Sequence, residues 1–130
     1  MKNIFTLILI ALGSLLVSFT NKGTEMDSVV VALKSGNANM LSRFFDNRVD
    51  ISLPDRSDNY SRSQAEMIIK DFFSSNGGVK SFEPKHRGEN SGSNFVIGML
   101  NTHNGRYRTT IFMKQKGDKQ LLQEVRFQQE

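Results

Sequence analysis

Apolar residues recur with helical spacing in three segments before residue 76. The segments are 25–34, 40–45 and 63–73, and such a three-to-four-residue period predicts amphipathic helices. The apolar positions are Met26, Val29, Val30 and Leu33 in the first segment, Met40, Leu41, Phe44 and Phe45 in the second, and Ala65, Ile68, Ile69, Phe72 and Phe73 in the third. Gly36 and the run Asn76-Gly77-Gly78 are typical helix stops. Ser63 and Glu66 fit a capping box, which places the start of the third helix at Ser63.

A period of two replaces the helical period elsewhere. Val49, Ile51 and Leu53 alternate with polar residues until Pro54, which predicts a strand. The polar connection 55–63 has room for a further short strand. Segments 79–89, 94–103, 106–115 and 120–128 also alternate, and Asn104-Gly105 between two of them predicts a two-residue hairpin turn. The order α-α-β-α-β-β-β-β indicates an α+β fold in which three helices pack on a curved antiparallel sheet.

Turn lengths predict which residues of the last four strands share a face. With two-residue turns throughout, one face carries Phe82, Phe95, Ile97, Met99, Phe112, Leu121, Val125 and Phe127. We expect this face to contact the helices. The other face mixes charged residues with Val96, Leu100, Tyr107, Ile111, Met113 and Leu122. Such an apolar surface predicts a homodimer through the outer sheet face, the alternative being a solvated face with scattered apolar residues.

Four polar residues are the candidates for ligand contact: Arg108, Asn101, Thr110 and His86. The predicted register places all four on the helix-facing side, with His86 and Arg108 in rows about 13 Å apart at ~3.3 Å per residue. Arg108 beside Asn101 could hold the carboxylate or phosphate of a small anionic ligand. The alternatives are an Arg108 paired with a helix carboxylate or backbone carbonyls, and a half-buried structural His86.

The N-terminal residues have the pattern of a secretory signal peptide. Lys2 precedes an apolar run from Ile4 to about Val17, which is typical of a cleaved leader over residues 1–20. A membrane anchor is the alternative, but the run is short for a span of about 20 residues. We therefore expect a single domain over residues 21–130, exported to the periplasm or the extracellular space, with no stable membrane insertion. Because the chain contains no cysteine, lipoprotein attachment and disulfides are excluded.

The charge of the chain is only mildly basic. The 130 residues contain 17 Lys and Arg against 13 Asp and Glu. Lys2 is the one charged side chain in residues 1–20, so removal of the leader lowers the net charge by one. No basic cluster is interleaved with aromatic residues, so we expect no nucleic-acid partner. His86 and His103 fall on distant rows, so neither a metal site nor a cofactor is expected.

Several stretches resemble a known family. They are "ALKSGNANMLSRFFDNRVDISLP", "SRSQAEMIIKDFF", "FEPKHRG" and "FVIGMLNTHNGRYRTTIFMK". Together they resemble the small secreted Bacteroidota proteins of the DUF4783 type, within the cystatin-like/NTF2-like superfamily. The resemblance implies a cone-shaped sheet, export, a concave pocket and dimerisation through the outer face, but no activity.

The function expected from the residues and the resemblance together is a non-catalytic binding or assembly module of the cell envelope. The alternative is an NTF2-like enzyme of the isomerase or dehydratase type, acting on a small hydrophobic substrate. Such an enzyme needs a carboxylate base and an oxyanion donor inside the cone. The predicted register turns Glu83, Glu124 and Tyr107 outward, which favours the binding module.

Overall fold

The structure, a computed structural model, describes residues 24–130. The predicted signal peptide and its cleavage site lie outside these residues. The described helices are α2 (Glu25–Ser35), α3 (Ala38–Ser42) and α4 (Arg62–Ser75). The strands are β1 (Phe45–Leu53), β2 (Arg56–Ser61), β3 (Val79–Asn90), β4 (Ser93–Thr102), β5 (Arg106–Lys116) and β6 (Lys119–Gln129). None of the described helices has the length and apolar character needed to span a bilayer.

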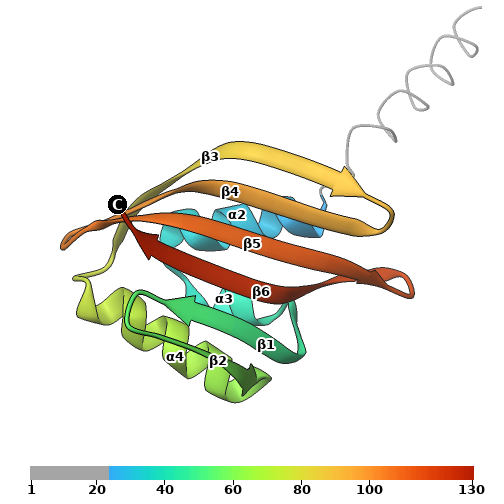
Figure 1. Cartoon of the computed structure of the whole chain (residues 1–130), viewed down its shortest axis with the longest axis horizontal. Coiled ribbons are helices and arrows are strands. Elements are labelled where there is room, and N and C mark those ends of the chain that lie inside the picture. The colour runs from blue at the N-terminus through green and yellow to red at the C-terminus, as the bar shows by residue number, and fades with distance from the viewer. Residues whose placement is uncertain (1–23) are drawn as a thin grey trace, which may run out of the picture.

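One curved sheet covers the helices, which lie behind it in Figure 1. Its strand order is β2-β1-β6-β5-β4-β3, so the four-strand meander predicted from the sequence is confirmed. The short strand β2 occupies the polar connection. β1 pairs with β6 in parallel, whereas every other neighbouring pair is antiparallel. The expectation of a purely antiparallel sheet is therefore wrong, because β1 pairs with the last strand of the chain.

The helix boundaries follow local capping chemistry. α2 begins as predicted, and Gly36 closes it in the left-handed conformation at φ 62°. α3 is shorter than predicted, because Phe45 already belongs to β1. The capping box of α4 is formed by Ser61 and Gln64, not by Ser63 and Glu66.

The predicted faces of the meander are inverted. The residues buried against the helices are those expected on the outer face: Val96, Leu100, Tyr107, Ile111, Met113 and Leu122. These residues therefore cannot form the contact surface of the predicted homodimer, and the homodimer itself stays a prediction. Phe95, Ile97, Met99, Phe112 and Leu121 lie on the opposite, outer face instead, half-buried or exposed.

Two β-bulges explain the inversion. The β3–β4 register shifts between Pro84 and His86, and the β5–β6 register shifts at Gln123. A bulge adds one residue to one strand and so turns the following side chains to the other face. Phe82, Val125 and Phe127 do face the helices as predicted. Phe82 precedes the bulge in β3, and Val125 and Phe127 follow the bulge in β6. The bulges therefore place these three residues on the face opposite Ile97, Met99 and Phe112.

The turns differ in how well their sequences predict them. Two-residue turns at Ser91-Gly92 and Gly117-Asp118 are confirmed, since Asn90 pairs with Ser93 and Lys116 with Lys119. The β4–β5 hairpin is longer, because Asn101 pairs with Arg106. Its four-residue loop is closed by the Thr102 amide, which donates to the Gly105 carbonyl at 2.9 Å. The Thr102 hydroxyl donates to the same carbonyl at 2.7 Å.

Aromatic side chains fill the space between the sheet and α4. The Phe72 ring lies 4.6 Å from Phe127 and 4.9 Å from Tyr107, centroid to centroid. Phe82 covers Gly98, where an added Cβ would lie 2.7 Å from the Phe82 ring and 2.4 Å from the Glu83 carbonyl oxygen. Glycine therefore lets these two strands approach closely. The concave side of the sheet is a packed core over the residues described.

Candidate ligand-binding site

A cavity of about 180 Å³ lies on the outer face of β3–β6. Its lining residues are Lys85, His86, Ile97, Gly98, Met99, Arg108 and Glu130. Ile97 and Met99 are half-buried and supply an apolar wall. Basic side chains and one carboxylate surround that wall. The cavity thus combines an apolar surface with charged groups.

The bulge in β3 determines which side chains reach this cavity. Pro84 has no N–H to donate, so it is confined to edge strands and bulges, and β3 is an edge strand. Lys85 is the extra residue of the bulge. Beyond it, His86 pairs with Ile97 and shares the outer face with it. The prediction that His86 lies on the helix-facing side is therefore wrong, and its side chain is exposed.

Arg108 is also on the outer face rather than on the predicted inner one. It pairs with Met99 on β4 and with Gln128 on β6, and it is exposed. The Met99–Arg108 row is the neighbour of the His86–Ile97 row. Two residues along a strand separate such rows by ~6.6 Å, about half the predicted separation. The structure thus brings His86 and Arg108 to one cavity.

Asn101 and Thr110 do not line the cavity. The Asn101 amide donates to the Ser81 hydroxyl at 2.9 Å, and its oxygen accepts from Arg106 Nε at 3.1 Å. Both ends of that amide are therefore occupied away from Arg108. Thr110 pairs with Ile97 and is half-buried. The predicted convergence of Asn101 and Arg108 on one anion does not occur.

One charged side chain of the cavity already forms an ion pair within the described chain, and the others do not. Lys85 Nζ lies 3.1 Å from Glu83 Oε2. Within residues 24–130, Arg108 forms no ion pair and no side-chain hydrogen bond, and the same holds for the side chains of His86 and Glu130. Arg108 therefore keeps its donors available for a ligand.

In two other hollows of the described surface, a charged side chain is already hydrogen-bonded within the fold. The first, of about 520 Å³, lies between the α2–α3 turn and α4. Its Glu66 accepts from Ser42 at 3.0 Å and from Asn39 at 3.3 Å. A second hollow, of about 310 Å³, lies where the N-terminal end of α2 meets the β3–β4 hairpin.

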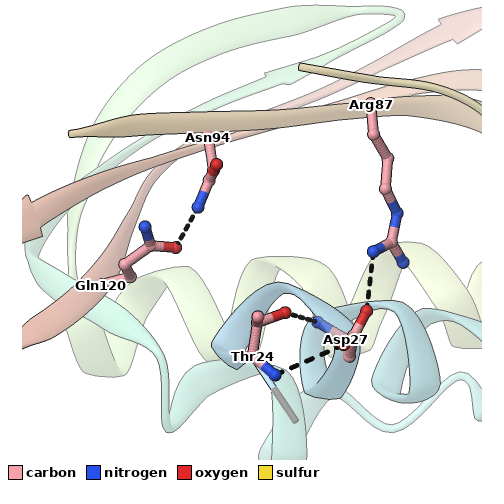
Figure 2. Close-up of polar contacts among 5 residues, drawn as sticks. All are labelled: Thr24, Asp27, Arg87, Asn94 and Gln120. Carbon is pink, nitrogen blue, oxygen red and sulfur yellow. Dashed lines mark hydrogen bonds and ion pairs between the residues drawn. The ribbon is translucent and has the colours of Figure 1, made fainter. Parts of the chain in front are cut away.

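Figure 2 shows the polar contacts around this second hollow. Arg87 Nη1 lies 2.7 Å from Asp27 Oδ1, joining β3 to the first turn of α2. The hydrogen bond from Arg87 and the bonds from Thr24 lower the pKa of Asp27 below its usual range. Because this arginine is already engaged, the outer-face cavity is the better candidate for binding an anionic group.

Tyr107 and Asp46 are relevant to the alternative of an NTF2-like enzyme, which would need an oxyanion donor and a carboxylate base. Tyr107 faces the helices, contrary to the prediction, and its hydroxyl donates to Asn76 Oδ1 at 2.6 Å. Asp46 is the single carboxylate among the buried residues of the described chain. It lies 2.6 Å from Lys116 Nζ and accepts from Gln123 at 3.0 Å. These bonds, led by that from Lys116, lower its pKa although burial opposes the shift. A carboxylate held ionised in an ion pair is a weak proton acceptor.

Sequence reasoning missed five of the cavity residues: Lys85, Ile97, Gly98, Met99 and Glu130. Pro84 within an otherwise regular strand was the signal for the bulge that brings Lys85 to the site. No local signal marks Glu130, because its place depends on how far β6 extends beside β5.

Comparison with known proteins supplies the family. The family model described as "Domain of unknown function (DUF4783)" matches residues 26–128. A DUF4783 protein from Bacteroides uniformis is 31% identical with a TM-score of 0.76, covering 80% of this chain and 95% of that one. Another from Bacteroides fragilis is 36% identical with a TM-score of 0.74, covering 79% and 96%.

More distant structures extend the likeness of the fold. An NTF2-like protein of unknown function from Cytophaga hutchinsonii has 9% identity and a TM-score of 0.59, covering 85% of this chain and 94% of that one. A search of curated proteins gave no match. The family and fold matches agree with the resemblance seen in the sequence, both in the α+β architecture and in the residues matched. The chain is a member of the DUF4783 family with an NTF2-like fold.

Proposed function

We propose that this chain is an exported, non-catalytic binding module of the cell envelope. Its ligand is a small molecule that carries a carboxylate on an apolar body, and it binds in the outer-face cavity. The observation that carries the proposal is an Arg108 guanidinium without an ion pair in residues 24–130, beside the apolar wall of Ile97 and Met99.

The chemistry of the cavity favours such a ligand. A guanidinium presents its donors as a fork that matches a carboxylate with two parallel hydrogen bonds. The apolar wall contributes by removing hydrocarbon from water, at about 25 cal/mol per Å². A cavity of roughly 150 Å³ holds a benzene molecule, so about 180 Å³ suits a ligand of similar size.

Two groups that an NTF2-like enzyme would use are engaged in the fold. The Tyr107 hydroxyl is bonded to Asn76, and the Asp46 carboxylate is bonded to Lys116 and Gln123. Neither group meets the outer-face cavity. This arrangement supports binding without catalysis.

The test is a titration of the purified protein with 4-methylpentanoate, followed by ligand-observed NMR. We expect saturable binding that Arg108→Met weakens at least tenfold. Lys114→Met removes a positive charge from an exposed residue of the same strand outside the cavity, and we expect it to change the affinity less than twofold. An equal loss in both variants would mean that general charge attraction explains the binding. A wild type that binds neither 4-methylpentanoate nor leucine, which has the same skeleton and carboxylate, would contradict the proposal.

His86 provides a further arm of the same test. Its side chain is exposed at the rim of the cavity, so His86→Phe should leave the fold intact. We expect the variant to retain 4-methylpentanoate binding, because Arg108 supplies the fork. If His86→Phe instead abolished a measurable turnover while the protein stayed folded, the enzyme alternative would replace the binding module.

A further inference from the structure

The outer-face cavity contains charged groups of both signs that are not paired within the described chain. Lys85 is neutralised locally by Glu83, at 3.1 Å. Among the lining side chains, the charges that remain are the Arg108 guanidinium and the Glu130 carboxylate, and no ion pair joins either of them to another group in residues 24–130. Arg106 lies on the same face but outside the lining, and its Nε donates to Asn101. The cavity thus presents one cation and one anion, and its balance is close to neutral.

The sheet register places these two groups on the same face. Arg108 pairs with Gln128, and Glu130 lies two residues beyond Gln128 on the outer face. The Glu130 amide donates to the Arg106 carbonyl at 3.1 Å, which fixes this end of the chain beside β5. With ~3.3 Å per residue and ~4.8 Å between strands, the two α-carbons are about 8 Å apart. Both side chains are long enough to meet one small ligand from its two ends.

A ligand with a single charge would leave one of these groups without a partner. A plain carboxylate would pair with Arg108 but would bring a second negative charge close to Glu130. A plain amine would pair with Glu130 but would face the Arg108 guanidinium. Both like-charge contacts are unfavourable in a partly desolvated site. A zwitterion avoids them, because its carboxylate pairs with Arg108 and its ammonium pairs with Glu130.

We propose that the cavity selects a zwitterion, and specifically an α-amino acid with an aliphatic side chain. Arg108 binds the α-carboxylate, Glu130 accepts hydrogen bonds from the α-ammonium, and the side chain packs on Ile97 and Met99. This inference rests on the proposed binding function and names the class of its ligand. The volume of about 180 Å³ leaves room for a branched side chain of leucine size.

The experiment compares leucine with its two singly charged analogues on the purified protein. 4-Methylpentanoate keeps the carbon skeleton and the carboxylate, whereas 3-methylbutylamine keeps the skeleton and the ammonium. We expect leucine to bind at least tenfold more tightly than either analogue. Glu130→Gln should lower leucine affinity at least fivefold while leaving 4-methylpentanoate affinity equal or higher. Glu89→Gln, at an exposed position outside the cavity, is the matched control and should change neither affinity.

The outcomes separate this inference from the proposed function. If 4-methylpentanoate binds as tightly as leucine, or if Glu130→Gln leaves leucine affinity unchanged, the zwitterion proposal is wrong and the carboxylate-binding function stands. If Arg108→Met does not weaken the binding of either acid, or if neither acid binds the wild type, the binding function itself is wrong.

Discussion

At the residue scale, a few polar groups decide where charge is stabilised in this protein. Asp46 is buried at the start of β1 and is bonded by Lys116 and Gln123. Gln123 is the bulged residue of β6. The same irregularity that changes the strand register therefore also supplies a hydrogen-bond donor to the buried carboxylate.

The lowered pKa of Asp46 predicts an acid-sensitive contribution to stability. Its folded-state pKa lies below the ordinary value of 3.8, so the unfolded chain binds more protons as the pH falls through and below that value. The stabilisation is thus present above pH ~4 and is lost as the pH falls through the folded-state pKa.

We expect Asp46→Asn to lower the free energy of unfolding by about 1–3 kcal/mol at pH 7, since hydrogen bonds to a charged group are lost. The difference from the wild type should shrink between pH 4 and pH 2 in urea titrations. Asp118→Asn, in the exposed β5–β6 turn, is the control. A difference that stays constant over this pH range would contradict the assignment.

At the element scale, α4 shows how a helix start is selected among competing signals. Two candidate pairs, Ser61 with Gln64 and Ser63 with Glu66, have the same spacing. β2 extends to Ser61, so the chain is still extended at Ser61 and the helix starts directly after it. Glu66 then accepts hydrogen bonds from α3, which joins the two helices.

This arrangement predicts different effects for the two serines. Ser61→Ala removes the side chain that caps α4 and should cost about 1 kcal/mol. Ser63→Ala, at an exposed helical position, should stay within about 0.5 kcal/mol of the wild type. Urea unfolding of both variants measures the difference. A larger loss for Ser63→Ala would return the cap to the position predicted from sequence.

At the scale of the whole molecule, the outer sheet face carries an apolar stripe. We define the stripe as Phe95, Ile97, Phe112 and Leu121. Phe95 pairs with Phe112 across β4 and β5, and Phe95 is 37% exposed. Charged residues next to the stripe are partly engaged within the chain, since Lys85 lies 3.1 Å from Glu83 and Glu124 lies 3.0 Å from Arg126. An apolar stripe in this setting suits a two-fold contact with the same stripe of a second copy.

We therefore propose a homodimer through this stripe, replacing the residues first expected there. Phe112→Glu should convert the dimer to a monomer in light scattering, because the apolar centre of the contact gains a charge. Met67→Glu, on α4 and 64% exposed, is the control and should leave the dimer intact. A wild type that is monomeric at high micromolar concentration would rule the proposal out. Because Ile97 belongs both to the stripe and to the cavity, ligand binding should also depend on protein concentration.

Export is a separate proposal about the whole chain. It rests on Lys2 followed by the apolar run to Val17. N-terminal sequencing of protein from the envelope fraction should find a mature chain that starts near Asn21. An intact Met1 in the integral-membrane fraction would favour the membrane anchor instead.

The candidate site could be predicted only in part. Arg108 and His86 were identified as residue types suited to ligand contact, and both line the cavity. Their face could not be predicted, because it depends on which side of the sheet packs against the helices. Their separation depends on the four-residue β4–β5 loop, which places Arg108 opposite Met99 instead of Asn101. The charge of Glu130 enters the site only through the alignment of the ends of β5 and β6.

The sequence by itself determined the helices, the strands of the meander and two of its three turns. These features depend on residues close together in the chain: apolar period, glycine at positive φ, and capping side chains. The tertiary structure decided the sheet register, the parallel pairing of β1 with β6 and the buried face. One bulged residue changes a side chain's face without changing the local pattern around it. Only contacts between distant strands and helices select between the two faces, and that selection places Arg108, His86 and Glu130 around one outer cavity.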